Sequence, residues 1–121
     1  LEWSHLLVVD RNLLMGSAPA EMISYLAQIP ATEKSAVLTE TLGDLQRQTK
    51  AASEALGSYQ KALGRSPSPQ QAVRLLVAVA EMGSAAGRDG EAAAAWKRLL
   101  LGHADHPVPL QTWQRIRGGI A

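Results

Sequence analysis

The residues of this sequence best suited to metal chemistry lie near its end, in the segment HADHP. His103, Asp105 and His106 place two imidazoles and a carboxylate close together there. Zinc accepts these ligand types, but a structural zinc site takes four protein ligands. The alternative is a polar loop with an aspartate near a turn, and the lack of a fourth ligand favours it. We therefore expect no metal and no other cofactor.

Catalytic patterns are missing from the chain. No strand–turn–helix elbow is evident that would expose a nucleophilic serine beside a histidine. The segment GRDG, Gly87–Gly90, lacks the spacing and the lysine–serine pair of a phosphate-binding loop. His5 lies in an apolar stretch, where a histidine is more often a packing residue than a ligand. The sequence therefore predicts a protein that is not an enzyme.

The composition is that of one ordinary globular domain. Of its 121 residues, 46% are hydrophobic and 19% are charged. The net charge of +1 and the scattered basic residues argue against a nucleic-acid surface. No apolar run of about 18 residues predicts a membrane span, and the absence of cysteine excludes disulfides and thiolate chemistry. Because the chain begins with Leu1 rather than methionine, we expect a fragment or a processed product of a longer protein.

Apolar residues recur at helical spacing throughout, which predicts an all-α fold. We expect helices over 2–14, from about 19 to 29, from about 33 to 49, over 51–65, over 69–86 and over 91–101, and a last one around Leu110, Trp113 and Ile116. The first is so apolar that we expect its neighbours to cover it. The three tryptophans, Trp3, Trp96 and Trp113, are interpreted as packing residues.

Capping residues mark several of these helix starts. Ser17, Thr32 and Asp89 are expected to cap the second, third and sixth helices. Ser68 with Gln71 three residues later forms a capping-box pattern before the fifth.

Ala51–Pro67 carries the most informative pattern. Ala55, Tyr59 and Ala62 lie on one helical face, together with Leu56 and Leu63, and Pro67 follows. This order resembles the second helix of a tetratricopeptide (TPR) repeat. Ala92 and Trp96 repeat Ala55 and Tyr59 after 37 residues. Gly43 and Gly87 also fit the family pattern, whereas Lys50 and Gln46 replace the family's turn glycine and aromatic residue.

The resemblance implies a TPR-like α-α superhelix of about three antiparallel helix pairs with a C-terminal capping helix. A degenerate repeat would cover 1–35, better repeats 36–69 and 73–106, and the capping helix 107–121. The mid-helix Gly43 costs roughly 1 kcal/mol relative to alanine and would be tolerated because a partner helix crosses closely there. Another helical hairpin array or a compact bundle is the alternative.

First helices of TPR pairs line the concave surface, so the resemblance implies a partner-binding groove. Its residues would be Glu40, Asp44, Arg47, Arg74, Val77 and Glu81. Such a mixed polar surface suits an extended or helical peptide, although charges at this spacing are also typical of a solvated face. The lysine and asparagine clamp of chaperone-binding TPR domains is absent from the matching positions.

The expected function is a non-catalytic protein–protein interaction scaffold. Analogy from the fold favours an accessory part of a bacterial envelope assembly, such as polysaccharide or cellulose export, pilus assembly or secretion. The alternative is a sensor or oligomerisation domain of a bacterial regulator. The partner is expected to be a protein or peptide, further repeats of the same chain, or a second copy, without nucleic acid or membrane insertion. The compartment is left open between bacterial periplasm and cytoplasm.

Overall fold

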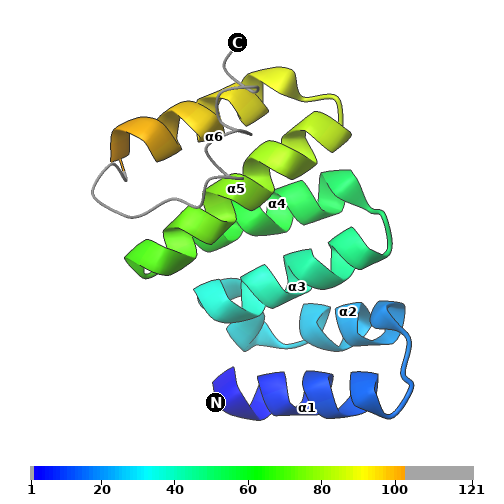
Figure 1. Cartoon of the computed structure of the whole chain (residues 1–121). Helices are drawn as coiled ribbons and strands as arrows, with labels where there is room; N and C mark the ends of the chain where they lie inside the picture. Colours follow the sequence, from blue (N-terminus) through cyan, green and yellow to red (C-terminus); the bar gives the residue numbers. More distant parts are fainter. Residues whose placement is uncertain (1, 103–121) are drawn as a thin grey trace.

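The computed structural model describes residues 2–102, and within them it contains α-helices, one 3₁₀-helix and no strand (Figure 1). The elements are α1 (Glu2–Leu14), α2 (Pro19–Ala27), the 3₁₀-helix η1 (Pro30–Lys34), α3 (Ala36–Gln48), α4 (Ala52–Leu63), α5 (Pro69–Ala85) and α6 (Asp89–Gly102). The predicted all-α fold class is confirmed. The expected capping helix, 107–121, lies outside the described residues.

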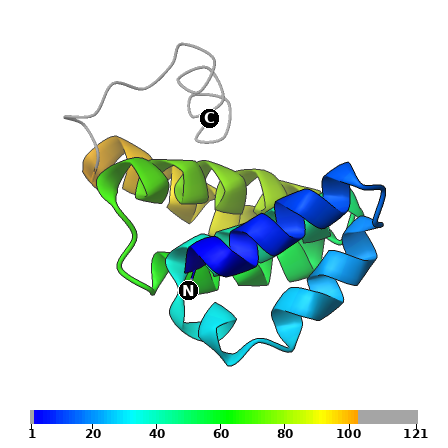
Figure 2. The ribbon, with the colours of Figure 1, turned by 90° about the horizontal axis from the view of Figure 1, so that it is seen from below.

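The helices form a stack in which successive helices run in opposite directions (Figure 1). The closest packing joins neighbours in sequence: α3 with α4, α4 with α5, and α5 with α6. Helix α1 lies at one end of the stack, and the view from below in Figure 2 shows it in front of the other helices. In the part of the chain that the structure describes, no helix is long and apolar enough to cross a membrane.

The core is divided into two clusters of unequal size. The larger one joins α4, α5 and α6, and its fully buried members include Leu56, Tyr59, Leu75, Leu76 and Leu99. The smaller one joins α1, α2 and α3 through Val9, Met22, Leu26, Leu38 and Leu45. The C-terminal part of the stack therefore holds most of the buried apolar surface.

Gly43 lies where α3 and α4 cross. A Cβ atom built on Gly43 would lie 2.8 Å from Cε1 of Tyr59, closer than real carbon atoms approach. The prediction that this glycine marks a close helix crossing is confirmed. Gly83 of α5 has the same role in the next crossing, because its Cβ would lie 3.2 Å from the backbone nitrogen of Ala92.

Three turns share one hydrogen-bond pattern. After α1, α3 and α5, a residue with positive φ follows the helix: Gly16 (99°), Lys50 (62°) and Gly87 (75°). In each turn the amide of the next residue donates to a carbonyl five residues back, as Ala51 does to Gln46 (3.0 Å). This is the Schellman ending of a helix, which satisfies carbonyls that the last turn leaves unpaired. The described chain is thus three helix pairs joined in the same way.

Two expectations about packing are wrong, and both concern α1. Val9 is the only residue of α1 that is buried, while Trp3 is 77% and Leu14 89% exposed. The reason is loose packing: α1 contacts α2 and α3 much less extensively than α6, at the other end of the described stack, contacts α5. Trp3 is therefore not a packing residue, whereas Trp96, 5% exposed, is one. Trp113 lies outside the described residues.

Two of the predicted caps are also wrong. Ala18 precedes α2, without a side-chain cap, so Ser17 does not have that role. Thr32 lies inside η1 and its hydroxyl donates to the carbonyl of Leu26 (2.8 Å), while Ser35 accepts from the amide of Leu38 (3.1 Å) and caps α3. Threonine and serine are both common N-cap residues. Because η1 includes Thr32 and ends at Lys34, the residue that directly precedes α3 is Ser35.

The predicted cap of α5 is confirmed, whereas the predicted cap of α6 is a third wrong one. Ser68 caps α5 as predicted, accepting from the amide of Gln71 (3.2 Å). Helix α6 begins at Asp89 itself, two residues earlier than expected, so Asp89 belongs to the first turn of the helix and does not precede it as a cap.

Candidate protein-binding surfaces

The six residues predicted to line a groove come from α3 and α5, and we call them the α3/α5 charged face. They are Glu40, Asp44 and Arg47 on α3, and Arg74, Val77 and Glu81 on α5. The structure brings the charged members together across the gap between these helices. Val77 is half-buried and packs against the larger core cluster.

Two ion pairs connect the helices of this face. The Arg74 guanidinium donates from Nε to Oε2 of Glu40 and from Nη2 to Oε1, both at 3.1 Å. Gln71 adds a third bond to Glu40 through its amide nitrogen (3.0 Å). Arg47 donates to Glu81 at 3.2 Å. The hydrogen bond with Glu40 and its negative charge outweigh partial burial and raise the pKa of Arg74.

Asp44 lies between the two ion pairs and accepts a hydrogen bond from the buried Tyr59 hydroxyl at 2.5 Å. Desolvation raises the pKa of the Asp44 carboxyl above its ordinary value, the nearby Glu40 adds to the increase, and the Tyr59 bond opposes it. Burial, followed by the bond and charge of Asp44, raises the pKa of Tyr59 well above that of a free tyrosine. Tyr59 thus links this face to the core.

The chemistry of the face follows from these pairs. Its two arginines already form ion pairs with carboxylates of the same molecule. A charged partner must therefore break these ion pairs before it can form its own with the same side chains. Exposed pairs of this kind contribute only about 0.2–1 kcal/mol each, so such an exchange costs little. The face can discriminate partners by charge pattern, but it supplies little apolar contact.

A stronger candidate, which the sequence analysis missed, is the outer side of α1. We call this surface the α1 outer face: Trp3, Leu7, Val8 and Leu14, with Met15 directly after the helix, all exposed. Trp3, Leu7 and Leu14 are spaced by four and seven residues, which places them on one side of the helix. Asp10 and Arg11, both exposed, lie between Leu7 and Leu14 along the helix, so charged side chains interrupt this apolar face. Large apolar side chains that gather on a surface among polar ones are typical of an interaction site. The high apolar content of residues 2–14 was the sequence signal for this surface, but it was interpreted as a sign that neighbouring helices cover the helix.

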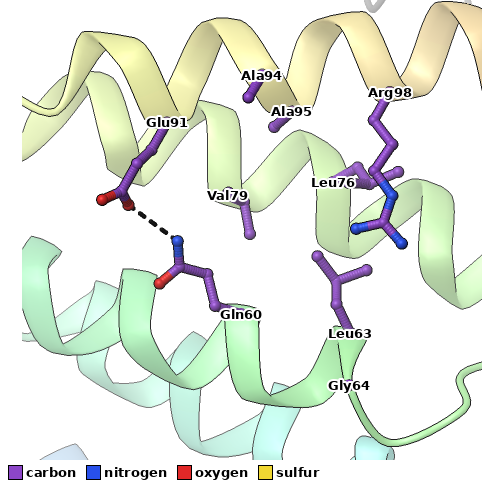
Figure 3. A pocket seen from close by; sticks show the side chains of 9 residues that line it. All are labelled: Gln60, Leu63, Gly64, Leu76, Val79, Glu91, Ala94, Ala95 and Arg98. Atoms are coloured by element: carbon purple, nitrogen blue, oxygen red, sulfur yellow. Dashed lines mark hydrogen bonds between the residues drawn. The ribbon is translucent and has the colours of Figure 1, made fainter.

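The third candidate is a groove of about 490 Å³ between α4 and α6, with α5 as its floor (Figure 3). Leu63, Leu76, Val79 and Ala95 provide its apolar lining. Gln60 donates to Glu91 (2.9 Å) and closes one end. Figure 3 shows Arg98 reaching from α6 toward Leu63 at the other end. We call this the α4/α6 groove. Its lining comes from three helices, so no local pattern in the sequence could reveal it.

Histidine chemistry plays no visible part in these surfaces. His5 packs against Tyr25, with its Nδ1 atom 3.0 Å from the tyrosine hydroxyl, as expected of a packing residue. Within residues 2–102, no three His, Cys, Asp or Glu side chains are grouped to hold a metal ion. His103, Asp105 and His106 lie outside that range.

Comparisons with known proteins give no family for the chain: no family model, no curated protein and no solved structure matches it.

Proposed function

We propose that this protein is a non-catalytic interaction scaffold that holds a partner protein. The observation that carries the proposal is the α1 outer face, where Trp3 and Leu7 are 77% and 63% exposed beside the still more exposed Leu14. Apolar side chains of this size stabilise a complex when a partner covers them, at about 25 cal/mol per Å² of apolar surface removed from water. Tryptophan is also among the residues most enriched in binding hot spots.

The α3/α5 charged face supplies the second element of the proposal. It places two exposed ion pairs on helices that are fixed by the core, so its charges are preorganised. Charge patterns of this kind contribute more to the selection of a partner than to the strength of binding. The TPR-like superhelix, the bacterial envelope assembly and the alternative role in a regulator stay predictions from the sequence.

The test is affinity capture from a lysate of the source cells, with the protein and three variants as baits. Trp3→Glu with Leu7→Glu removes the apolar character of the α1 outer face. Glu40→Arg with Arg74→Glu reverses the charge pattern of the α3/α5 charged face while it keeps an ion pair. Ser53→Glu with Lys97→Glu, at exposed positions on α4 and α6 and so outside both surfaces, is the matched control.

The proposal is supported when a defined protein is captured by the parent and the control and lost with either surface variant. Capture that none of the variants changes would contradict it. The same baits separate the alternatives: an envelope component points to the assembly role, whereas recovery of the protein's own parent chain points to oligomerisation.

A further inference from the structure

The α1 outer face is ordered across the helix, with an apolar line between two opposite charges. Trp3, Leu7 and Leu14 form the line, because steps of four and seven residues return to nearly the same side at 3.6 residues per turn. Asp10 and Arg11 are consecutive, so they lie about 100° apart around the helix, on opposite borders of this line. All five side chains are exposed. The apolar line therefore has one acidic border and one basic border.

The internal repeat shows which side of α1 a preceding helix pair would cover. Gly16 and Lys50 end α1 and α3 in the same way, so the two helices correspond with an offset of 34 residues. The residues of α3 that pack with α1 and α2 in the smaller core cluster are Leu38, Leu42 and Leu45. Their counterparts on α1 are Ser4, Val8 and Arg11. Two of these three are polar, so the apolar line of α1 does not match the contact surface of another helix pair of this kind.

A second copy of the chain fits both the apolar line and its borders. When two α1 helices lie side by side and parallel about a two-fold axis, each residue of the line meets its own copy. The acidic border of each helix then faces the basic border of the other, so Asp10 meets Arg11 of the second copy on both sides of the contact. In an antiparallel pair each border would face the same border of the second copy, with carboxylate toward carboxylate and guanidinium toward guanidinium.

We propose that two copies of this protein associate through parallel α1 helices, with Trp3, Leu7 and Leu14 in the contact and an ion pair between Asp10 and Arg11 on each side. In Figure 2, α1 lies in front of the other helices, so this end of the stack is open to a second copy. Each copy contributes one helix of 13 residues, and such a small contact buries less than about 1,200 Å² in total. The dimer should therefore be in equilibrium with the monomer, with a dissociation constant of roughly 10–100 µM.

This inference rests on the proposed function, because it names the partner of the same surface. The experiment is analytical ultracentrifugation of the purified 121-residue chain alone, between about 1 µM and about 500 µM. We expect the average mass to rise from that of a monomer toward that of a dimer. Leu7→Glu places two carboxylates in the contact and should leave the protein monomeric. Glu54→Lys, an acid-to-lysine change at an exposed position of α4, is the matched control for the charge variants and should dimerise as the parent does.

Two charge variants test the borders of the line. Asp10→Lys makes both borders basic and should weaken the dimer roughly tenfold at low salt, because like charges then face each other. Arg11→Glu makes both borders acidic and should weaken it by a similar factor. An equimolar mixture of the two variants should dimerise about as tightly as the parent, since a basic helix then pairs with an acidic one. Added salt should reduce all of these differences.

Disulfide formation tests the direction of the two helices, because the chain contains no native cysteine. Trp3→Cys and Leu14→Cys, oxidised separately, should each form a dimer, since the parallel pair brings each position to its own copy within the few ångströms that a disulfide bridges. Ser53→Cys, at an exposed position of α4, is the control and should stay reduced under the same conditions. In an antiparallel pair, a mixture of the first two variants would instead give the mixed disulfide.

Several outcomes would overturn the inference. They are a protein that stays monomeric over the whole range, a dimer that Leu7→Glu leaves unchanged, a dimer that Asp10→Lys leaves unchanged or strengthens, and a mixed disulfide that exceeds both symmetric ones. A monomer here leaves the scaffold proposal to the lysate capture, where a different protein can bind the α1 outer face. Capture of no defined protein contradicts the scaffold proposal and leaves a dimer of the purified chain unaffected.

Discussion

The two ends of the described stack are built from similar residues with opposite results. Helix α6 buries Trp96 and Leu99 against α5, and both belong to the larger core cluster. Helix α1 is also rich in large apolar residues, but it buries Val9 alone and exposes Trp3, Leu7 and Leu14. Burial is therefore decided by which neighbours a helix has, and not by its own apolar content. A helix with an unused apolar side can serve as a binding surface.

The comparison of the two tryptophans should give the largest effect. Trp96→Ala creates a cavity in the larger core cluster and should lower the free energy of unfolding by about 3–5 kcal/mol. Trp3→Ala removes an exposed side chain and should change it by no more than about 0.5 kcal/mol. Chemical denaturation of both variants beside the parent measures this. Equal losses for the two variants would show that Trp3 is covered, and the contrast between α1 and α6 would be lost.

A pair of glycines tests the helix crossing that joins the two halves. Gly43→Ala gains roughly 1 kcal/mol of helix propensity but forces its Cβ into Tyr59, and overpacking costs about 1–3 kcal/mol. We expect a net destabilisation of about 1 kcal/mol. Gly57→Ala, in the middle of α4 with nothing within 4 Å of its Cβ, should stabilise by about 0.5–1 kcal/mol. Thermal melts of the two variants and the parent measure these changes in stability. Stabilisation by Gly43→Ala would mean that the Tyr59 ring can shift to make room for the added Cβ.

The hydrogen bond between Tyr59 and Asp44 should make the stability of the protein depend on pH in the alkaline range. Tyr59→Phe should cost about 1 kcal/mol at neutral pH through the lost hydrogen bond. Because the folded-state pKa of Tyr59 is raised, its contribution is fully present below the ordinary tyrosine pKa of about 10 and is lost as pH rises above it. The parent should therefore lose stability above that pH more steeply than Tyr59→Phe. Denaturation curves across the alkaline range measure this, and parallel profiles would contradict it.

The smallest effect is expected at the ion pairs of the α3/α5 charged face. A double-mutant cycle with Glu40→Gln and Arg74→Gln should give a coupling of about 0.2–1 kcal/mol that declines as salt is added. The reversed pair, Glu40→Arg with Arg74→Glu, should fold normally. Coupling near zero in low salt would show that this ion pair adds nothing measurable to stability. Coupling well above this range would show that they hold α3 and α5 together.

The sequence predicted the helices well because their ends carry strong local signals. Pro19, Pro69 and the cap Ser68 mark helix starts, and Gly16 and Gly87 mark helix ends. The helix predicted within Ala51–Pro67 was placed correctly as well, and its residues Ala55, Tyr59 and Ala62 share one face and are all buried. The 3₁₀-helix η1 was not predicted, because its five residues are too few to show a periodic apolar pattern.

The candidate surfaces were predicted less completely. The residues of the charged face were predicted from the TPR resemblance, which puts the first helices of successive pairs on one surface, and the structure brings Glu40 to Arg74 and Arg47 to Glu81. What the sequence could not give was their pairing, which depends on the angle between α3 and α5. The exposure of α1 and the depth of the α4/α6 groove depend on neighbours that are distant along the chain. Local patterns contain no information about such neighbours.

Packing between sequence neighbours also determines how this chain folds. Because α3, α4, α5 and α6 each contact mainly the next helix, few contacts require the closure of a long loop, and folding of such chains is typically complete within about microseconds to milliseconds. We expect α4–α6 to form first, and α1, which has only one buried residue, to open first in the native state. Amide hydrogens of α1 should then exchange with solvent long before those of α5. A surface that opens so readily is also one that a partner can order when it binds.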